Sequence, residues 1–537
     1  MAKKRQTDNS DISKAVVHLK PILGIEPGAY LTGIYAFLLI VILFLIFVLP
    51  GLTHWGSEIV VHTTPAGSAI YVDGRYDGAT PKTIFVQGGS HDLSIRKPYY
   101  ANVDQHLSVS GRLIGSLLFP RTVRVTASLS VADLNGLLAS AFQDYSRWAL
   151  VDKVVPNYQI PPILQSTVIG ALESKGFSRP DILKQFLTGA MGDVTNEALM
   201  QDFMKAASAL YASGKKLTPI NVLTSVPDFT SLAAKYPDLP FWAVYSLPPA
   251  ERTKAMESSW YREAAASYGQ RMASFTATEN PGTRAPLSIG GLQFIYVPGG
   301  RYIMGASVGA VPKDPSLANT DLPHIQSVPD FYMMSTEITH SEYARFVAAN
   351  PEWAPDRATQ LTGSGLATSD YLKGWIGDSS QVPQAYVSYY AAEAYCAWLT
   401  KQLPPALAGY TVTLPNEAEW EWAARMNVNP DRSVFHETAT EEQPVGSGAP
   451  NTLGIRDLLG NVWEWNQDWF FPAAYFLVSA DGTSSLEDGR IGKGAEVAVR
   501  GGSWASSRDS VTYTTRGSQP PTWCTPFLGF RPIIVKD

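Results

Sequence analysis

Cysteine and charge are both scarce in this sequence. The 537 residues include 2 cysteines, and Asp, Glu, Lys and Arg together make up 17%. Two cysteines exclude a disulfide-rich scaffold, a Cys-ligated iron–sulfur cluster and a Cys-rich zinc module, and they permit one disulfide at most. The net charge of −6 argues against a nucleic-acid-binding protein, which normally carries a basic face. Hydrophobic residues reach 45%, which excludes a globally disordered chain and is enough for several hydrophobic cores.

One stretch near the N-terminus carries no charge. Asp, Glu, Lys and Arg are absent between Glu26 and Glu58, and residues 31–49 are almost wholly apolar. About 20 apolar helical residues span a hydrocarbon core of about 30 Å, so the sequence predicts a transmembrane anchor over residues 31–50. The apolar run is longer than the roughly 7–15 residues of a signal peptide, and no small-residue cleavage motif follows it. We therefore expect an uncleaved anchor.

The basic residues around this helix predict its orientation. Several lysines and an arginine precede it, whereas the first basic residue after it is Arg75. Positive residues stay on the cytoplasmic side, so we expect residues 1–30 to form a cytoplasmic tail and the later domains to be exported. The predicted location is the cytoplasmic membrane, single-pass, with the N-terminus inside and the C-terminal domains in the periplasm. The preceding basic residues are Lys3, Lys4, Arg5, Lys14 and Lys20.

Short runs with strand chemistry fill residues 57–128. β-branched and aromatic residues alternate with turn pairs such as Asp73-Gly74 and Asp77-Gly78, a pattern typical of a small all-β sandwich. The segment from Thr64 to Tyr100 resembles the PEGA domain. Its motif reads Pro65-Ala66-Gly67-Ser68, which departs from the family motif at two of four letters. The resemblance implies a location in the cell envelope and says little about chemistry.

The hydrophobic period becomes helical over residues 131–277. Leu134, Leu138 and Phe142 fall on one helical face, and similar faces recur between proline-bearing breaks. We predict an all-α spacer domain here and recognise no ligand-binding pattern in it. Residues 278–286 are typical of a linker.

Residues 291–537 carry a series of aromatic-rich blocks in a fixed order. This ordered set resembles the formylglycine-generating enzyme family, also called sulfatase-modifying-factor domains. The resemblance implies an α+β domain with a C-type-lectin-like fold over residues 288–537. Fold does not settle function, because many members of the family are not oxidases. The most distinctive blocks are LPNEAEWEWAAR from Leu414, DLLGNVWEW from Asp457, VRGGSW from Val499 and LGFRP from Leu528.

The oxidase members of this family use a pair of cysteines shortly after the Arg-Gly-Gly-Ser block, because soft thiolates hold Cu(I) for oxygen activation. Ser506 and Val511 stand at the corresponding positions here. A hydroxyl and an isopropyl group cannot replace two thiolates. Cys396 lies on an apolar helical face and fits a core position, and a disulfide between Cys396 and Cys524 stays open as an alternative. We therefore expect no copper and no formylglycine generation by the known route.

The resemblance implies a different metal site in the block that begins at Asp457. In the family, this loop binds calcium through two side chains and two backbone carbonyls. The matching positions are Asp457 and Glu464 for the side chains, and Gly460 and Val462 for the carbonyls. Calcium takes about six to eight oxygen ligands, which carboxylates and loop carbonyls supply. We expect one structural Ca²⁺; the alternative is that Asp457 caps a turn while Glu464 pairs with a basic residue.

Four residues lie where the resemblance places the substrate cleft, and we expect them to face a ligand. Exposed Trp and Arg side chains often anchor binding sites, which makes this patch the best candidate. The four residues are Ser503, Trp504, Arg508 and Arg516.

The sequence as a whole predicts a multidomain, membrane-anchored envelope protein whose terminal domain binds or scaffolds a protein or glycan partner. One alternative is an oxidoreductase of the same fold that uses a non-cysteine site; His324, Glu337 and His340 would be its metal candidates. Another alternative is a carbohydrate-binding module, in which Trp504 would contact the sugar.

Overall fold

The computed structural model describes residues 19–116, 118–151, 160–305, 322–375, 380–426, 428–482 and 493–537. Contacts divide the chain into two compact units. The first comprises residues 1–132 and 173–177, and the second comprises residues 133–172 and 178–537. The basic residues Lys3, Lys4, Arg5 and Lys14, on which the predicted orientation depends, lie outside the described residues.

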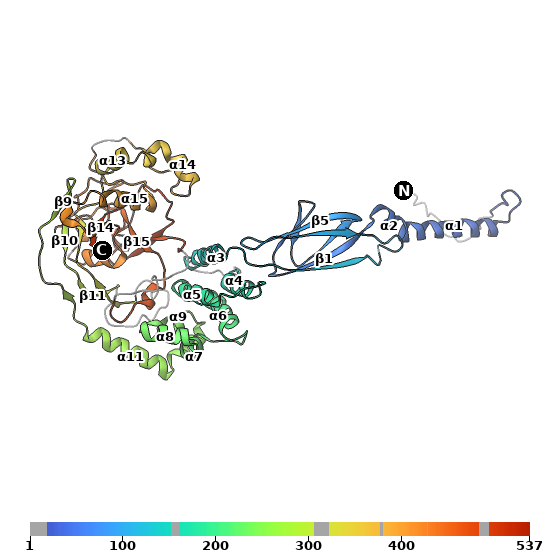
Figure 1. Ribbon diagram of the computed structural model, residues 1–537, viewed down its shortest axis with the longest axis horizontal. Helices are drawn as coiled ribbons and strands as arrows, with labels where there is room; N and C mark the ends of the chain where they lie inside the picture. The colour runs from blue at the N-terminus through green and yellow to red at the C-terminus, as the bar shows by residue number, and fades with distance from the viewer. Residues whose placement is uncertain are drawn as a thin grey trace, which may run out of the picture. The chain divides into compact units, whose positions relative to one another are not determined.

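The first unit begins with two apolar helices, α1 (Pro27–Phe47) and α2 (Leu49–Thr53) (Figure 1). Proline opens α1, where its fixed φ suits the first helical turn. None of the residues of α1 is buried, whereas an apolar helix in a soluble core would be covered by neighbours. Together they form a segment, Pro27–Thr53, that is long and apolar enough to cross a membrane. The segment could serve as a membrane anchor or as a signal sequence.

Two β-sheets follow in the first unit. In one, β1 (Gly56–Thr64) lies between β4 (Lys82–Gln87), antiparallel to it, and β7 (Thr122–Ser128), parallel to it. The other sheet has the order β3-β2-β5-β6. Alternate residues of β1 and β5 are buried, as in strands with one face on a core. The strands of the second sheet are β2 (Ala69–Val72), β3 (Arg75–Ala79), β5 (Gly89–Arg96) and β6 (Val103–Val109).

Helices α3 to α11 open the second unit, in the segment where the sequence predicts an all-α domain. Side-chain caps begin several of them: Asp133 accepts a hydrogen bond from Gly136 N (2.8 Å), and Asn196 accepts one from Leu199 N (3.0 Å). Prolines begin others at their first turn. The helices are α3 (Leu134–Ala149), α4 (Ile163–Leu172), α5 (Pro180–Ala190), α6 (Glu197–Tyr211), α7 (Pro219–Ser225), α8 (Pro227–Lys235), α9 (Leu239–Tyr245), α10 (Pro249–Met256) and α11 (Ser259–Ser274).

The C-terminal part of the second unit consists of three small sheets with helices packed around them. The sheet orders are β14-β19-β13-β10-β9, β12-β11-β8 and β17-β16-β15-β18. A large aromatic and aliphatic core joins α13 and α15 to the first of these sheets. The elements are β8 (Thr278–Glu279), β9 (Leu287–Ile289), β10 (Leu292–Val297), β11 (Gly300–Met304), β12 (His324–Val328), β13 (Phe331–Met334), α13 (His340–Ala349), α14 (Ala358–Gly363), α15 (Tyr389–Thr400), β14 (Tyr410–Thr413), α16 (Glu417–Ala424), β15 (Trp463–Trp469), β16 (Val497–Arg500), β17 (Arg516–Gln519), β18 (Leu528–Gly529) and β19 (Ile533–Lys536).

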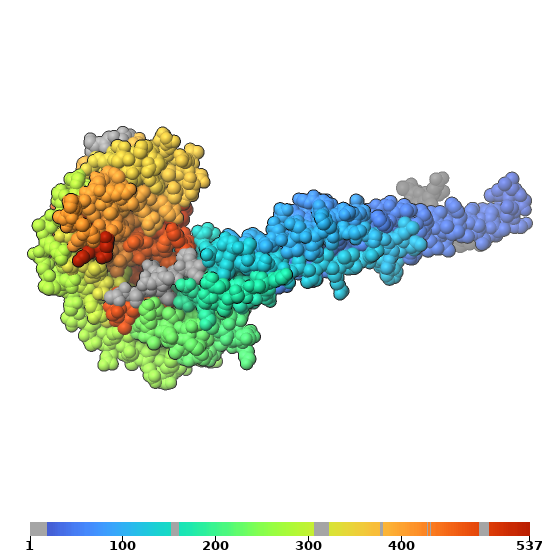
Figure 2. Space-filling model, viewed as in Figure 1, coloured from blue at the N-terminus to red at the C-terminus, as the bar shows by residue number. Residues whose placement is uncertain are grey.

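The helices and the C-terminal part pack together inside the second unit, and their surfaces adjoin in Figure 2. The ring centroids of Phe142 and Phe471 lie 6.1 Å apart. The Tyr268 hydroxyl donates a hydrogen bond to Pro323 O (2.7 Å). Apolar and polar contacts of this kind make the helices a support for the C-terminal part, in addition to their role as a connecting segment.

Candidate functional site in the C-terminal part

The Arg-Gly-Gly-Ser block forms a tight turn at the end of β16. Gly501 and Gly502 have φ of +98° and +75°, a region that side chains disfavour. A Cβ on Gly502 would also lie 2.8 Å from Val511 Cγ1. The two glycines therefore let the following loop fold back, so that Val511 packs onto the turn.

Ser506 and Val511 stand where oxidase members of the formylglycine-generating enzyme family would carry cysteine. Both side chains are engaged in packing or hydrogen bonds. The Ser506 hydroxyl accepts a hydrogen bond from Ser503 N (3.1 Å), and Val511 is buried against Gly502. Ser503 itself is buried, and its hydroxyl accepts a hydrogen bond from Ala505 N (3.2 Å). Ser503 therefore shapes the turn, although we had expected it to face a ligand.

Trp504 and Arg508 are the members of the expected patch that reach the surface. The Trp504 indole is half-buried, and its Nε1 donates to Pro526 O (3.3 Å). The Arg508 side chain is 46% exposed and pairs with Asp431 at 3.0 Å. Because Asp431 is itself 74% exposed, this ion pair is screened by water and easily exchanged for a ligand group.

Arg516 does not face a cleft, contrary to our expectation from the sequence. Its side chain is 1% exposed, and its guanidinium donates through Nε and Nη2 to the two carboxylate oxygens of Glu417, each at 2.6 Å. The ring centroids of Phe470 and Tyr475 each lie 4.5 Å from its Cζ. This bidentate, aromatic-flanked geometry is that of a structural ion pair.

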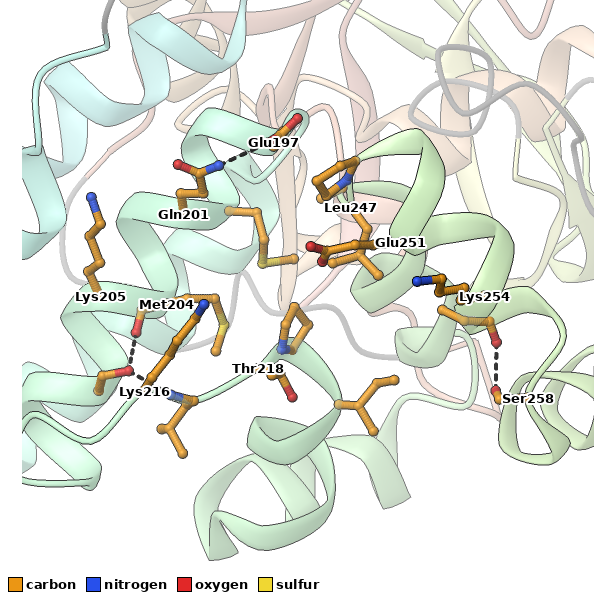
Figure 3. Close-up of a pocket in the computed structure, with 18 residues that line it drawn as sticks. Glu197, Gln201, Met204, Lys205, Lys216, Thr218, Leu247, Glu251, Lys254 and Ser258 are labelled. Atoms are coloured by element: carbon orange, nitrogen blue, oxygen red, sulfur yellow. Dashed lines mark hydrogen bonds between the residues drawn. The ribbon is translucent and has the colours of Figure 1, made fainter.

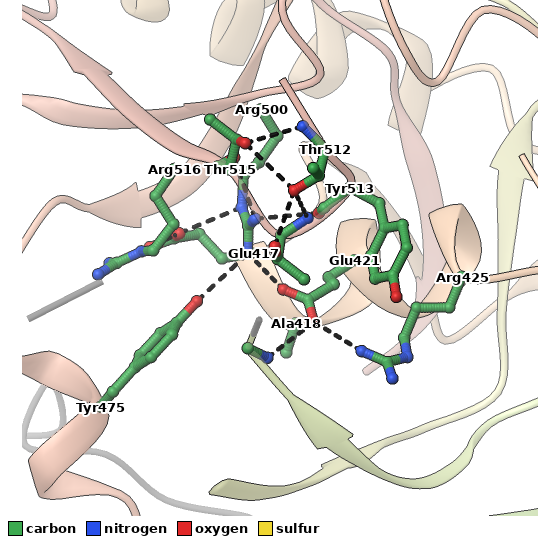
Figure 4. Close-up of polar contacts among 12 residues, drawn as sticks. Glu417, Ala418, Glu421, Arg425, Tyr475, Arg500, Thr512, Tyr513, Thr515 and Arg516 are labelled. Atoms are coloured by element: carbon green, nitrogen blue, oxygen red, sulfur yellow. Dashed lines mark hydrogen bonds and ion pairs between the residues drawn. The ribbon is translucent and has the colours of Figure 1, made fainter. Parts of the chain in front are cut away.

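A buried charge network surrounds that pair (Figure 4). Arg500 lies opposite Arg516 in the antiparallel register of β16 and β17, so two like charges meet across the sheet. Helix α16 supplies the compensating acids: Glu417 lies 3.2 Å from Arg500 Nε, and Glu421 accepts from Arg500 Nη2 at 3.0 Å. Burial alone would raise the pKa of Glu417, but Arg516 and Arg500 outweigh burial and hold that pKa below its usual value.

The loop from Asp457 to Glu464 has the backbone of a specialised turn. Asp457 and Asn461 have positive φ, and a Cβ on Gly460 would lie 2.3 Å from Val434 O. The Asp457 carboxylate accepts hydrogen bonds from Gly446 N and from Gly448 N. Val462 is fully buried. The loop is therefore held by its own backbone donors as well as by its side chains.

Glu464 occupies the inner end of this loop. Its carboxylate accepts hydrogen bonds from Arg531 Nη2 (2.7 Å) and Trp420 Nε1 (2.8 Å). Glu337 is also completely buried here: Asn461 Nδ2 donates to its Oε1 at 3.0 Å, while its Oε2 lies 3.9 Å from Arg531 and has no hydrogen-bond partner among the described residues. Burial, followed by the nearby charge of Asp457, raises the pKa of Glu337.

The buried carboxylates around this loop outnumber the positive charges beside them. Three buried carboxylates, Glu337, Asp457 and Glu464, act on one another and on the single guanidinium of Arg531. The surplus of negative charge needs a cation or a proton, because uncompensated buried charge is costly. The oxygens of Asp457 and Glu464, with the loop carbonyls, are of the kind that Ca²⁺ prefers. These oxygens are of the right kind for calcium, but those of Asp457 already accept hydrogen bonds from backbone N–H groups. Glu464 is likewise engaged by Arg531 and Trp420, so the contacts seen are those of the alternative, a turn cap and an ion pair.

Both cysteines are buried and free. Cys396 on α15 and Cys524 belong to the same hydrophobic core. Burial raises the pKa of the Cys396 thiol, and it raises that of Cys524 to about 11. Protonated thiols are poor nucleophiles and poor metal ligands.

The histidines considered as metal candidates occupy different surroundings. His324 is buried, its ring centroid lies 4.5 Å from that of Tyr475 in a tilted arrangement, and its Nδ1 hydrogen-bonds Leu322 O (3.1 Å). Burial lowers its pKa to about 4. His340 begins α13, with its ring centroid 6.4 Å from that of Trp375. Among the described residues, no group of three or more His, Cys, Asp or Glu side chains is arranged to hold a metal.

The buried charge network is not among the features that the sequence predicts. Glu417, Glu419 and Glu421 all lie on α16, and Asn416 caps this helix in a capping box with Glu419. Arg500 and Arg516, the partners of Glu421 and Glu417, follow about 80 and 100 residues later, at the ends of two strands. One sequence pattern could have predicted this network: arginines within apolar strand segments, together with a helix rich in acidic residues.

Two family models match the chain. Residues 284–536 match the sulfatase-modifying factor enzyme 1-like domain, and residues 56–112 match the PEGA domain. Both resemblances inferred from the sequence are thereby confirmed.

Three individual proteins illustrate the similarity. An uncharacterized protein of Borreliella burgdorferi is 21% identical over 541 residues, which cover 99% of this chain and 100% of that protein. A formylglycine-generating enzyme of Streptomyces coelicolor is 27% identical over 294 residues, covering 44% of this chain and 87% of the enzyme. The solved structure of PvdO from Pseudomonas aeruginosa aligns with a TM-score of 0.37 and 19% identity, covering 47% of this chain and 99% of PvdO.

Proposed function

Because residues 284–536 are a sulfatase-modifying factor enzyme 1-like domain and residues 56–112 a PEGA domain, we propose that this chain is a membrane-anchored envelope protein whose terminal domain binds or scaffolds a partner without thiol chemistry. The observation that carries the proposal is the pair Ser506 and Val511. One is a hydroxyl that accepts a hydrogen bond from Ser503 N, and the other is an isopropyl group packed on Gly502. Neither can ligate copper.

The remaining thiols support the same function. Cys396 and Cys524 lie inside the hydrophobic core with raised pKa values. A reactive thiolate needs partial exposure and a positively charged neighbourhood, and these cysteines have neither environment.

The partner is a protein or a glycan of the envelope, contacted through Trp504 and Arg508. These two side chains reach solvent from a turn that is shaped by Gly501 and Gly502 and closed by the hydrogen bond from Ser503 N to Ser506. A rigid turn that carries an indole and a guanidinium is well suited to binding, because little side-chain entropy is lost when the partner arrives.

The anchor is Pro27–Thr53, and the basic residues before it keep the N-terminus in the cytoplasm. Lys20 precedes the helix, and Arg75 is the first basic residue after it. Under this orientation both matched domains are periplasmic.

One calcium ion stabilises the terminal domain in this proposal. Asp457 and Glu464 would supply carboxylate oxygens, and Gly460 and Val462 would supply carbonyls. The surplus of buried carboxylates over Arg531 supports a cation there. The ion contributes stability and takes part in no reaction.

The test is a Cu(I) titration of the full chain in lipid nanodiscs, with a colorimetric copper chelator as competitor. The expected result is no stoichiometric copper on the wild-type chain. The double variant Ser506→Cys/Val511→Cys should gain about one tightly bound copper, since it restores two soft ligands on the same turn. Tight copper on the wild-type chain would overturn the proposal.

A further inference from the structure

An open groove lies on the helical part of the second unit (Figure 3). Its volume is about 810 Å³, within the range of known binding sites of roughly 300–1,000 Å³. Helices α6, α7 and α10 and the segments that precede α7 and α10 line it. Neither matched family model includes these residues.

The floor of the groove is apolar and adaptable. Met200, Met204 and Ser208 form a row along α6 at intervals of four residues, which corresponds to about 12 Å of helix. Leu247 and Ile220 complete the floor from two other segments. Methionine side chains are flexible and polarisable, so they can fit apolar groups of varied shape.

The rim of the groove carries more positive than negative charge. Lys205, Lys216 and Lys254 are exposed, and none of them forms an ion pair among the described residues. Two acids, Glu197 and Glu251, share the rim. Glu197 already accepts a hydrogen bond from Gln201 Nε2 at 2.9 Å.

The buried carboxylate of Asp202 attracts Lys205 but forms its hydrogen bonds with other groups. Asp202 accepts hydrogen bonds from Leu164 N (2.8 Å) and Gln165 N (3.1 Å), at the start of α4. Lys205 therefore remains available to an incoming group, as do Lys216 and Lys254, which form no ion pair among the described residues. Figure 3 shows Lys205 and Lys216 on one side of the groove and Lys254 on the other.

We propose that this groove binds an acidic amphipathic segment of a partner protein. Apolar side chains of the segment would fill the floor over Met200 and Met204, and carboxylates on its flanks would pair with Lys205, Lys216 and Lys254. Lysines on both sides of the floor favour a ligand with several separated carboxylates. An acyl chain, which carries charge at one end, would leave one side unpaired.

The test is selection of random 16-residue segments by display against the full chain in nanodiscs. Segments that also bind the variant Met204→Glu are removed by counter-selection. The expected winners carry apolar residues at helical or strand spacing and an excess of Asp and Glu. Enrichment of no segment, or of segments without an acidic excess, overturns the proposal.

The charge-reversed variant Lys205→Glu/Lys216→Glu then provides a second measurement, because surface substitutions should leave folding intact. It should bind the selected segment at least tenfold more weakly. The matched control Lys235→Glu, which lies at the end of α8 outside the groove, should bind as the wild type does. The proposal is overturned if the charge-reversed variant and the control bind the selected segment with equal affinity. It is also overturned if palmitate binds the groove and no segment does.

This proposal concerns the helical part and does not rest on the absence of thiol chemistry. Copper bound to the terminal domain would not contradict the proposed groove function. Failure of the selection would not contradict the proposed function of the terminal domain.

Discussion

Arg516 and Glu417 form a bidentate ion pair inside the C-terminal part, with two nitrogen–oxygen contacts of 2.6 Å. The same Glu417 also lies 3.2 Å from Arg500, which in turn reaches Glu421. Removing one member would strand a buried charge rather than remove a single contact.

The substitution Arg516→Met should therefore lower the free energy of unfolding of the second unit by about 3–5 kcal/mol. Chemical unfolding of the full chain in detergent, followed by tryptophan fluorescence, measures the change. Arg508→Met is the matched control, since that guanidinium is 46% exposed and pairs with exposed Asp431; its cost should stay below about 1 kcal/mol. Similar losses for the two variants would mean that the buried network is not what stabilises the turn.

His324 should make the stability of the C-terminal part sensitive to acid. Its pKa is about 4 in the folded chain because burial disfavours the charged ring, against an ordinary value of 6.5. A lowered histidine pKa means that the folded state is favoured above pH 6.5 and loses that advantage as the pH falls toward 4. The loss amounts to about 3 kcal/mol over that window.

Unfolding measured between pH 7 and pH 4 checks this dependence. The variant His324→Asn, which cannot titrate, should flatten the profile between pH 6.5 and 4. The exposed residue His436 serves as control, and His436→Asn should leave the profile as in the wild type. If His324→Asn shows the same pH profile of unfolding as the wild type, the acid sensitivity arises from other groups.

Calcium should stabilise the terminal domain through the loop from Asp457 to Glu464. Chelation with EDTA should lower the melting temperature of the wild-type chain, and added Ca²⁺ should restore it, since binding to the folded state alone stabilises that state. Asp457→Asn should abolish the difference between the two conditions. Asp431→Asn, a change of an exposed carboxylate on the same part of the chain, should preserve it. No shift with EDTA in the wild-type chain would mean that a proton, rather than calcium, compensates Glu337.

Half-buried Trp504 and exposed Arg508 should matter for the partner and not for the fold. Trp504→Ala should abolish binding to the envelope partner, or to a glycan array, while the melting temperature changes by a few degrees at most. A partner retained by both Trp504→Ala and Arg508→Ala would place the binding surface elsewhere.

Local patterns predicted much of this molecule from its sequence. The charge-free run predicted the apolar helix α1, because a long uninterrupted apolar stretch is recognisable from its own composition. The apolar helical face predicted around Cys396 is present as α15, Tyr389–Thr400, with Cys396 buried on it. The ordered blocks identified the terminal domain, since each of them shapes a turn or a strand end.

Contacts between distant residues were beyond prediction. Arg516 was expected at a ligand cleft, but its partner Glu417 lies 99 positions earlier, and no periodicity links them. Likewise, the contact between the tilted rings of Phe142 and Phe471 joins the helices to the C-terminal part. The sequence pattern of either segment taken alone is equally compatible with an independent domain. Pairings of this kind depend on how sheets and helices pack, which single-segment patterns do not encode.

The most direct test of the central claim is mass spectrometry of a cysteine-containing sulfatase-type peptide after incubation with the full chain, copper and oxygen. We predict that the peptide cysteine stays unchanged, because Ser506 and Val511 cannot hold copper and both remaining thiols are buried. Conversion of that cysteine to formylglycine in many turnovers per chain would contradict the account and establish the terminal domain as an oxidase.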